Sequence, residues 1–240
     1  MKKEDFIYKM QEKSKDLGVR FSVEQTEQFF EYMNLLIEWN EKMNLTAITE
    51  PEDIILKHFI DSITILKEIK EDVKLVDVGT GAGFPGIPIS IMKPSIKVTL
   101  VDSLNKRLMF LQEVADKLNL KNINMLHMRA EELGQNKKYR ESFDIATSRA
   151  VANLSTLSEY LIPLVKVNGK VISMKASSAQ EEIKQANNAI NVLGGAIKKI
   201  EEFNLPQSDI GRTIIVINKI KHTPKKYPRK SGIPSKEPLK

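Results

Sequence analysis

The spacing of hydrophobic positions divides the chain into two unlike parts. Up to about residue 70, apolar side chains recur at helical intervals, as Phe29, Met33 and Leu36 do. From residue 73 onward, short apolar runs rich in Val, Ile and Leu alternate with helix-like segments. The predicted parts are an N-terminal helical cap over 1–70, a larger α/β domain over 71–218 and a C-terminal tail over 219–240.

The second part is predicted to form a seven-stranded sheet. Five strands alternating with helices are expected over 75–78, 96–101, 122–127, 143–147 and 169–174. The helices are expected near 85–94, 105–118, 151–165 and 178–194. Two last strands, 196–203 and 212–219, have no helix between them, which favours an antiparallel pair. The alternation predicts a doubly wound α/β fold, a mostly parallel sheet with helices on both faces.

A glycine-rich turn follows the first predicted strand. Glycines stand at positions 79, 81, 83 and 86, directly after the apolar run 75–78. Glycine lets the backbone turn sharply and approach a ligand with no side chain in between. The helix that follows would point its free N–H groups back at the turn, so a nucleotide-like ligand is expected there.

Two cofactors compete for this turn. Segment 81–86 satisfies the Gly-x-Gly-x-x-Gly pattern of dinucleotide sites, and Asp102 follows at a distance that suits a ribose. Asp77, two residues before the first glycine, favours S-adenosylmethionine instead, because a carboxylate can hold the cationic amine of its methionine part and would repel a pyrophosphate. Phe84 and Pro85 also stand where a dinucleotide site needs small residues. S-adenosylmethionine is therefore the favoured cofactor, and a nicotinamide dinucleotide remains the alternative.

The carboxyl ends of the strands are where a sheet of this kind binds ligands. The predicted cofactor-binding residues at that edge are Gly79, Gly81, Phe84, Asp102, Ala130, Glu131 and Arg149. Asp102 is expected to accept hydrogen bonds from the ribose hydroxyls, and Glu131 with the backbone near Ala130 to meet the adenine. Two alternatives stay open: Glu131 as a first-turn acid of a short helix, and Phe84 as a core side chain instead of a cover over the sulfonium. Arg149 is expected to position the cofactor or the target base, not to act as a base.

Missing residue types narrow the chemistry. The sequence has no cysteine, which disfavours disulfides and the cysteine-dependent methylation of pyrimidine carbon 5. After the fourth strand stands Ser148-Arg149-Ala150, where enzymes that methylate exocyclic amines commonly carry an Asn/Asp-Pro-Pro-aromatic motif. A ring nitrogen such as guanine N7 already carries a lone pair and needs in-line placement but no general base. A ring nitrogen acceptor is therefore expected, with no catalytic base.

Other features limit the location and partners of the chain. Three scattered histidines make a metal site unexpected, and His58 is expected to belong to the core. The N-terminus becomes acidic at Glu4 and Asp5, unlike a signal peptide, and no apolar run is long enough for a membrane span. A cytoplasmic protein is expected. No strong self-association stripe is visible, so a monomer is expected.

The positive charge is concentrated in the tail. Residues 219–240 hold eight Lys or Arg and one acid, a balance of +7, which leaves −1 for residues 1–218 out of a total of +6. A polyanion is the expected partner. Prolines argue against regular structure beyond residue 220, so deleting 222–240 is expected to weaken RNA binding and leave cofactor affinity nearly unchanged. The predicted RNA-binding residues of the tail, around Tyr227, are Lys225, Lys226, Arg229 and Lys230.

Several short motifs together resemble one family over nearly the whole chain. They are Asn44-Leu45-Thr46, His58-x-x-Asp61-Ser62, the glycine turn with Phe84-Pro85-Gly86, Val101-Asp102-Ser103-x-x-Lys106-Arg107, Arg129-Ala130-Glu131, Ser148-Arg149-Ala150, Lys175 and Thr223-Pro224-x-x-Tyr227-Pro228-Arg229. In combination they resemble the ribosomal RNA small subunit methyltransferase G family, also called glucose-inhibited division protein B. The resemblance implies a class I, Rossmann-like methyltransferase fold.

The resemblance also implies an activity. It implies methylation of guanine N7 in the 530-loop region of bacterial 16S rRNA, within the small ribosomal subunit or its precursor, with S-adenosylmethionine as donor. The cofactor contacts that it implies are Gly79, Phe84, Ala130, Glu131 and Arg149, and Lys175 is assigned to the RNA. Two other functions stay open: a nicotinamide-dependent oxidoreductase, and a non-catalytic RNA-binding assembly factor.

Overall fold

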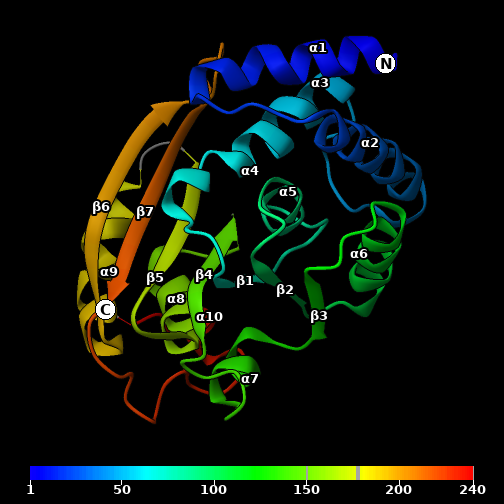
Figure 1. Ribbon diagram of the computed structural model, residues 1–240. Helices are drawn as coiled ribbons and strands as arrows, with labels where there is room; N and C mark the ends of the chain where they lie inside the picture. Colours follow the sequence, from blue (N-terminus) through cyan, green and yellow to red (C-terminus); the bar gives the residue numbers. More distant parts are fainter. Residues whose placement is uncertain (150, 177–178, 240) are drawn as a thin grey trace.

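A seven-stranded sheet forms the centre of the molecule (Figure 1). The computed structural model describes residues 1–149, 151–176 and 179–239. The strand order is β3-β2-β1-β4-β5-β7-β6, with β1 to β5 parallel and β7 antiparallel to both its neighbours. The strands are β1 Lys74–Val78, β2 Lys97–Asp102, β3 Ile123–His127, β4 Phe143–Arg149, β5 Val165–Ala176, β6 Gly195–Asn204 and β7 Gly211–Lys219. The predicted class I methyltransferase fold, with its closing antiparallel pair, is confirmed.

Helices cover both faces of the sheet. One apolar cluster joins the cap to α5 and α6, and a second one lies under α7, α8 and α9. The helices are α1 Lys3–Ser14, α2 Val23–Met43, α3 Pro51–Asp53, α4 Asp61–Ile63, α5 Gly86–Met92, α6 Asn105–Lys117, α7 Ala130–Gln135, α8 Leu154–Leu161, α9 Gln180–Leu193 and α10 Ile233–Lys236. Since both faces are buried, the central strands read as continuous apolar runs.

The boundary between α8 and β5 differs from the prediction. The helix was expected to reach residue 165, with a kink or interruption at Pro163, and the strand to begin at 169. In the structure α8 ends at Leu161, and a short 3-10 turn, Ile162–Leu164, leads directly into β5. Pro163 prevents the helix from continuing, and Val165 pairs with Phe143 of β4.

The cap is packed into the core. Its third helical segment runs from α3 through a π-helix, Ile54–Ile60, into α4. Phe59 on this segment lies 5.3 Å from the ring of Tyr32 on α2, which in turn stacks 5.4 Å from Phe84 after the glycine turn. The hydroxyl of Tyr32 donates to the backbone oxygen of Ala82. These contacts make one aromatic layer of the cap and the turn.

The tail beyond residue 220 has little regular structure, as expected, but it is fixed to the rest of the protein by side-chain contacts. The tail folds back under α7 and α8 and ends in α10 (Figure 1). Arg140 donates to three tail carbonyls, those of Thr223 at 2.8 Å, Pro224 at 3.3 Å and Tyr227 at 2.6 Å. Tyr227 is only 7% exposed, so its ring is buried in the core instead of open to a base. Prolines exclude strands here, but one guanidinium satisfies the carbonyls that are left over.

A buried ion pair fixes the tail to α8. Glu159 is fully buried, and its two oxygens accept from the guanidinium and the backbone N–H of Arg229 at 2.7–3.2 Å. Arg229 also donates to the backbone oxygen of Glu237. Its predicted role in RNA binding therefore competes with a structural one.

Arg229→Ala should lower the free energy of unfolding by about 3–5 kcal/mol, because it leaves the Glu159 carboxylate buried without its cation. Lys230→Ala, at the exposed neighbouring position, is the matched control and should change stability by less than about 0.5 kcal/mol. Urea unfolding followed by circular dichroism measures both. Equal midpoints for the two variants would show that the pair does not anchor the tail.

Candidate active site

The glycine turn is built around a buried carboxylate. Asp77 is fully buried, and its Oδ2 accepts from Gly86 N at 2.9 Å and from Thr80 Oγ1 at 2.7 Å. Burial raises the pKa of Asp77 to about 6. Among the described residues, the other oxygen of Asp77 has no hydrogen-bond partner. At Gly79, φ is +69° and a Cβ would lie 2.7 Å from Val151, so the turn requires a residue without one.

Asp102 ties the end of β2 to the same turn. Its Oδ2 accepts from Gly81 N at 3.0 Å, its Oδ1 accepts from Leu104 N at 2.9 Å, and Arg107 pairs with it at 3.2 Å. The carboxylate is 2% exposed. A carboxylate has about four lone-pair sites, and these three donors leave one on Oδ1 that can accept from a ligand hydroxyl.

A crevice of about 190 Å³ lies at the carboxyl ends of β1, β2 and β3, next to the glycine turn. It brings together four of the predicted cofactor residues, Gly79, Asp102, Ala130 and Glu131. The tail adds a wall that the sequence did not reveal. Gly232 and Ser235 line the crevice, and Gly232 N donates to the buried Glu131 at 2.8 Å. The expected independence of cofactor binding from residues 222–240 is therefore revised, because deleting them removes part of the crevice.

Phe84 lies outside this crevice. Its ring is 5% exposed and stacks 4.3 Å from the ring of His58, with Tyr32 on another side. The guanidinium of Arg149 sits 4.9 Å from the centre of the same ring. Of the two interpretations of Phe84, the structure shows the core position.

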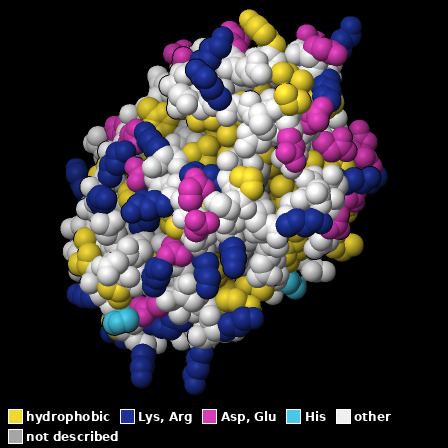
Figure 2. All heavy atoms as spheres, viewed as in Figure 1, with side chains coloured by type: hydrophobic (Ala, Val, Ile, Leu, Met, Phe, Trp, Pro, Cys, Tyr) yellow, Lys and Arg dark blue, Asp and Glu magenta, His cyan; other side chains and the backbone are white. Residues whose placement is uncertain are grey.

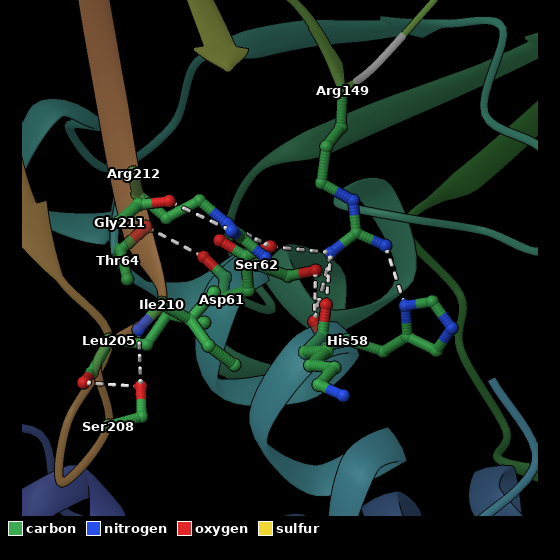
Figure 3. Close-up of polar contacts among 11 residues, drawn as sticks. His58, Asp61, Ser62, Thr64, Arg149, Leu205, Ser208, Ile210, Gly211 and Arg212 are labelled. Carbon is green, nitrogen blue, oxygen red and sulfur yellow. Dashed lines mark hydrogen bonds and ion pairs between the residues drawn. The ribbon is translucent and has the colours of Figure 1, made fainter. Parts of the chain in front are cut away.

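Arg149 at the end of β4 points into the cap, where it meets the π-helix (Figure 3). Its Nη1 donates to the backbone oxygen of Lys57 at 3.0 Å and to Asp61 Oδ2 at 3.2 Å, and its Nη2 contacts His58 Nδ1 at 2.9 Å. A π-helix places carbonyl groups out of the usual register, which suits an inserted side chain. Asp61 Oδ2 also accepts from Arg212 of β7 at 3.0 Å.

His58 is held in one neutral form. A guanidinium can only donate, so His58 Nδ1 accepts, and the proton lies on Nε2, which donates to Thr46 Oγ1 at 2.9 Å. Burial and the neighbouring Arg149 lower the pKa of His58 to about 3. His58 is thus buried, as expected, and it also orients Arg149.

A second pocket, of about 260 Å³, opens beside Arg149 at the ends of β4 and β5 and the start of β7. Asp61, Arg212 and Lys175 line it. Lys175 forms an ion pair with Glu182 at 2.7 Å. To contact RNA as predicted, Lys175 must either bind Glu182 and RNA together or leave Glu182.

The remaining tail lysines stay on the surface. Lys225, Lys226 and Lys230 are exposed, in contrast to Arg229. Lys and Arg side chains project from the lower edge of the face in Figure 2, the side of the molecule where Figure 1 places the tail. The described residues contain no group of three His, Asp or Glu side chains that could hold a metal ion. No helix in the described part of the chain is long and apolar enough to cross a membrane.

Comparison with known proteins identifies the family. Residues 25–210 match the family of rRNA small subunit methyltransferase G. The chain belongs to this family. It is 55% identical over 229 residues to "Ribosomal RNA small subunit methyltransferase G" of Clostridium botulinum, covering 95% of this chain and 96% of that protein. The protein of the same name from Oceanobacillus iheyensis is 49% identical over the full length of both chains. A solved "SAM dependent methyltransferase" from Aquifex aeolicus shares the fold, with a TM-score of 0.54 at 18% identity over 72% of this chain and 96% of that one.

The family's methyl donor is S-adenosylmethionine, and the crevice fits it. Asp77 lies behind the glycine turn, two residues before the crevice-lining Gly79, and its buried oxygen without a partner among the described residues suits the ammonium group of the methionine part. Asp102 offers the acceptor that a ribose needs, and the bare backbone at Gly79 leaves room for close approach. A pyrophosphate would meet two buried acids here, which disfavours the dinucleotide alternative.

Cofactor affinity should depend on pH through Asp77. Below pH 6 the carboxyl is protonated in the free protein and must lose its proton to hold the ammonium, so affinity should fall by up to about tenfold per pH unit. Above pH 6 affinity should be flat. Calorimetric titration with S-adenosylhomocysteine, which carries the same amine, measures this. Asp77→Asn should bind weakly at every pH, and Asp116→Asn, at an exposed position, should behave as the wild type does.

Proposed function

We propose that this chain methylates N7 of a guanine in the 530-loop region of 16S rRNA, in the small ribosomal subunit or its precursor. The family name supports a small-subunit rRNA substrate. The observation that carries the choice of a ring nitrogen is the state of His58. Both its nitrogens are engaged, with Arg149 and Thr46, and its pKa of about 3 leaves it neutral and a poor base. An acceptor that already carries a lone pair fits such a site.

The residues of the chain position the methyl donor and the target base and exclude water. They do not transfer protons. When bound, the sulfonium supplies a methyl group to the N7 lone pair, the C–S electrons stay on sulfur, and the positive charge passes to the purine. Asp77, behind the glycine turn, would hold the amine. Asp102 would hold the ribose, and Ala130 with Glu131 the adenine end. Arg149 would lie between the donor crevice and the acceptor pocket, because its guanidinium is hydrogen-bonded to the cap. In-line placement of the two reactants then supplies the rate enhancement.

The product distinguishes an enzyme from a non-catalytic assembly factor. Purified protein, labelled donor and small subunits carrying unmodified 16S transcript should give one labelled guanosine, mapped by borohydride and aniline cleavage at N7-methylguanosine. Asp102→Asn should lower the rate more than tenfold at limiting donor, because it weakens both the turn and the bond to the ribose. Unlabelled RNA, or label on another atom, would contradict the proposal.

The exposed tail lysines should supply salt-dependent affinity for the particle. Replacing Lys225, Lys226 and Lys230 together by Ala should reduce the slope of log affinity against log salt by about 0.7–0.9 for each phosphate that the tail no longer neutralises. Cofactor affinity should not change, because none of the three lines the crevice. A matched triple variant in the cap, Lys2, Lys15 and Lys42 to Ala, is the control for the change in net charge. Equal slopes for the two triple variants would rule out a specific role of the tail.

A further inference from the structure

The pocket beside Arg149 shares no lining residue with the donor crevice, yet both lie along the same edge of the sheet. Arg149 at the end of β4 lines the pocket, and Val151, two residues later, lines the crevice. Along the sheet edge the crevice spans β1, β2 and β3, and the pocket spans β4, β5 and β7. A molecule in the pocket would therefore lie next to the donor end of the crevice, as an acceptor must.

The pocket is lined by one carboxylate and several positively charged side chains. Asp61 is 2% exposed and lies between Arg149 and Arg212, which both donate to its Oδ2 (Figure 3). Within the described part of the chain, the second oxygen of Asp61 has no hydrogen-bond partner. A buried carboxylate oxygen without a donor is costly, so a ligand donor would be stabilised there. Ile48 and Met174 add apolar surface to the same pocket, against which a flat ring can pack.

We propose that this pocket binds the flipped target guanine and that Asp61 Oδ1 accepts a hydrogen bond from its 2-amino group. This inference rests on the proposed function and adds the residue that selects guanine. Adenine offers no donor at the equivalent position, so it would leave the carboxylate oxygen unpaired. The cations Lys57 and Lys175 at the pocket wall favour the electron-rich O6 and the RNA phosphates.

This arrangement also aids the reaction. N7 lies on the opposite edge of the purine from the amino group, so anchoring the amino edge leaves N7 free to meet the methyl group. As N7 gains its methyl group, positive charge spreads over the ring and the N1–H and amino groups become stronger donors. The bond to Asp61 is therefore stronger in the transition state than in the bound substrate, which lowers the barrier.

Small subunits reconstituted with guanosine or inosine at the target position test this, because inosine lacks only the 2-amino group. The wild type should show a kcat/KM about 10–100-fold lower on inosine. Asp61→Asn should lower kcat/KM on guanosine and bring the guanosine-to-inosine ratio below about 3. A purely structural Asp61 would lower both values alike and keep the ratio. Asp144→Asn, at a carboxylate paired with Lys166 outside the pocket, is the control and should keep the wild-type ratio.

A binding measurement provides a second, activity-free readout. Wild-type protein saturated with S-adenosylhomocysteine should bind GMP about tenfold more tightly than IMP by calorimetry, and Asp61→Asn should bind both equally. If wild type methylates guanosine and inosine equally well, or binds GMP and IMP equally, the role of Asp61 is overturned while the proposed function stands. If guanosine particles are not methylated at all, the proposed function itself fails. Should Asp61→Asn not fold, the wild-type comparisons alone decide.

Discussion

The buried guanidinium of Arg149 is the group on which the arrangement of this molecule depends. It leaves the end of β4 and enters the cap, where a carboxylate, an imidazole and a backbone carbonyl accept from it. Burial lowers the pKa of Arg149, and the charges of Asp61 and Asp77 oppose that shift. Arginine suits this position because its planar fork reaches several acceptors at once and its charge is weakly hydrated. The cap is thereby held in a fixed position over the edge of the sheet that carries the site.

Several features follow from that one group. His58 is neutral because it is buried beside Arg149, and its tautomer is fixed because Arg149 can only donate. The ring of Phe84 packs against the ring of His58 and against the guanidinium of Arg149, and it thereby supports the glycine turn. The same guanidinium holds one oxygen of Asp61, while among the described residues the other oxygen has no partner. In the proposed recognition of guanine, Asp61 would therefore both hold the cap and contact the substrate.

The sequence was sufficient wherever a property depends on neighbours along the chain. The strand–helix alternation, the glycine turn and the carboxylates Asp77 and Asp102 are local signals, and the structure places them as expected along the strand ends. The sequence was insufficient where partners are distant. Nothing near Arg149 reveals that its acceptors lie about 90 residues earlier, on a π-helix.

The tail is a second case in which the sequence did not reveal distant partners. Its basic and proline-rich composition is equally typical of a solvated chain end. Only the fold reveals that Arg140 and Glu159 bind the tail. Buried, fully satisfied polar pairs of this kind cannot be recognised until both partners are placed. Charge alone therefore overstated how much of the tail is free for RNA.

The crevice wall formed by Gly232 and Ser235 has a consequence for the synthesis of the protein. Both residues come after β7, the last strand of the sheet, so a ribosome translates them only when every strand is already made. This wall is therefore the last part of the crevice to be synthesised. A product that ended after β7 would lack Gly232 and Ser235, together with the bond from Gly232 N to Glu131.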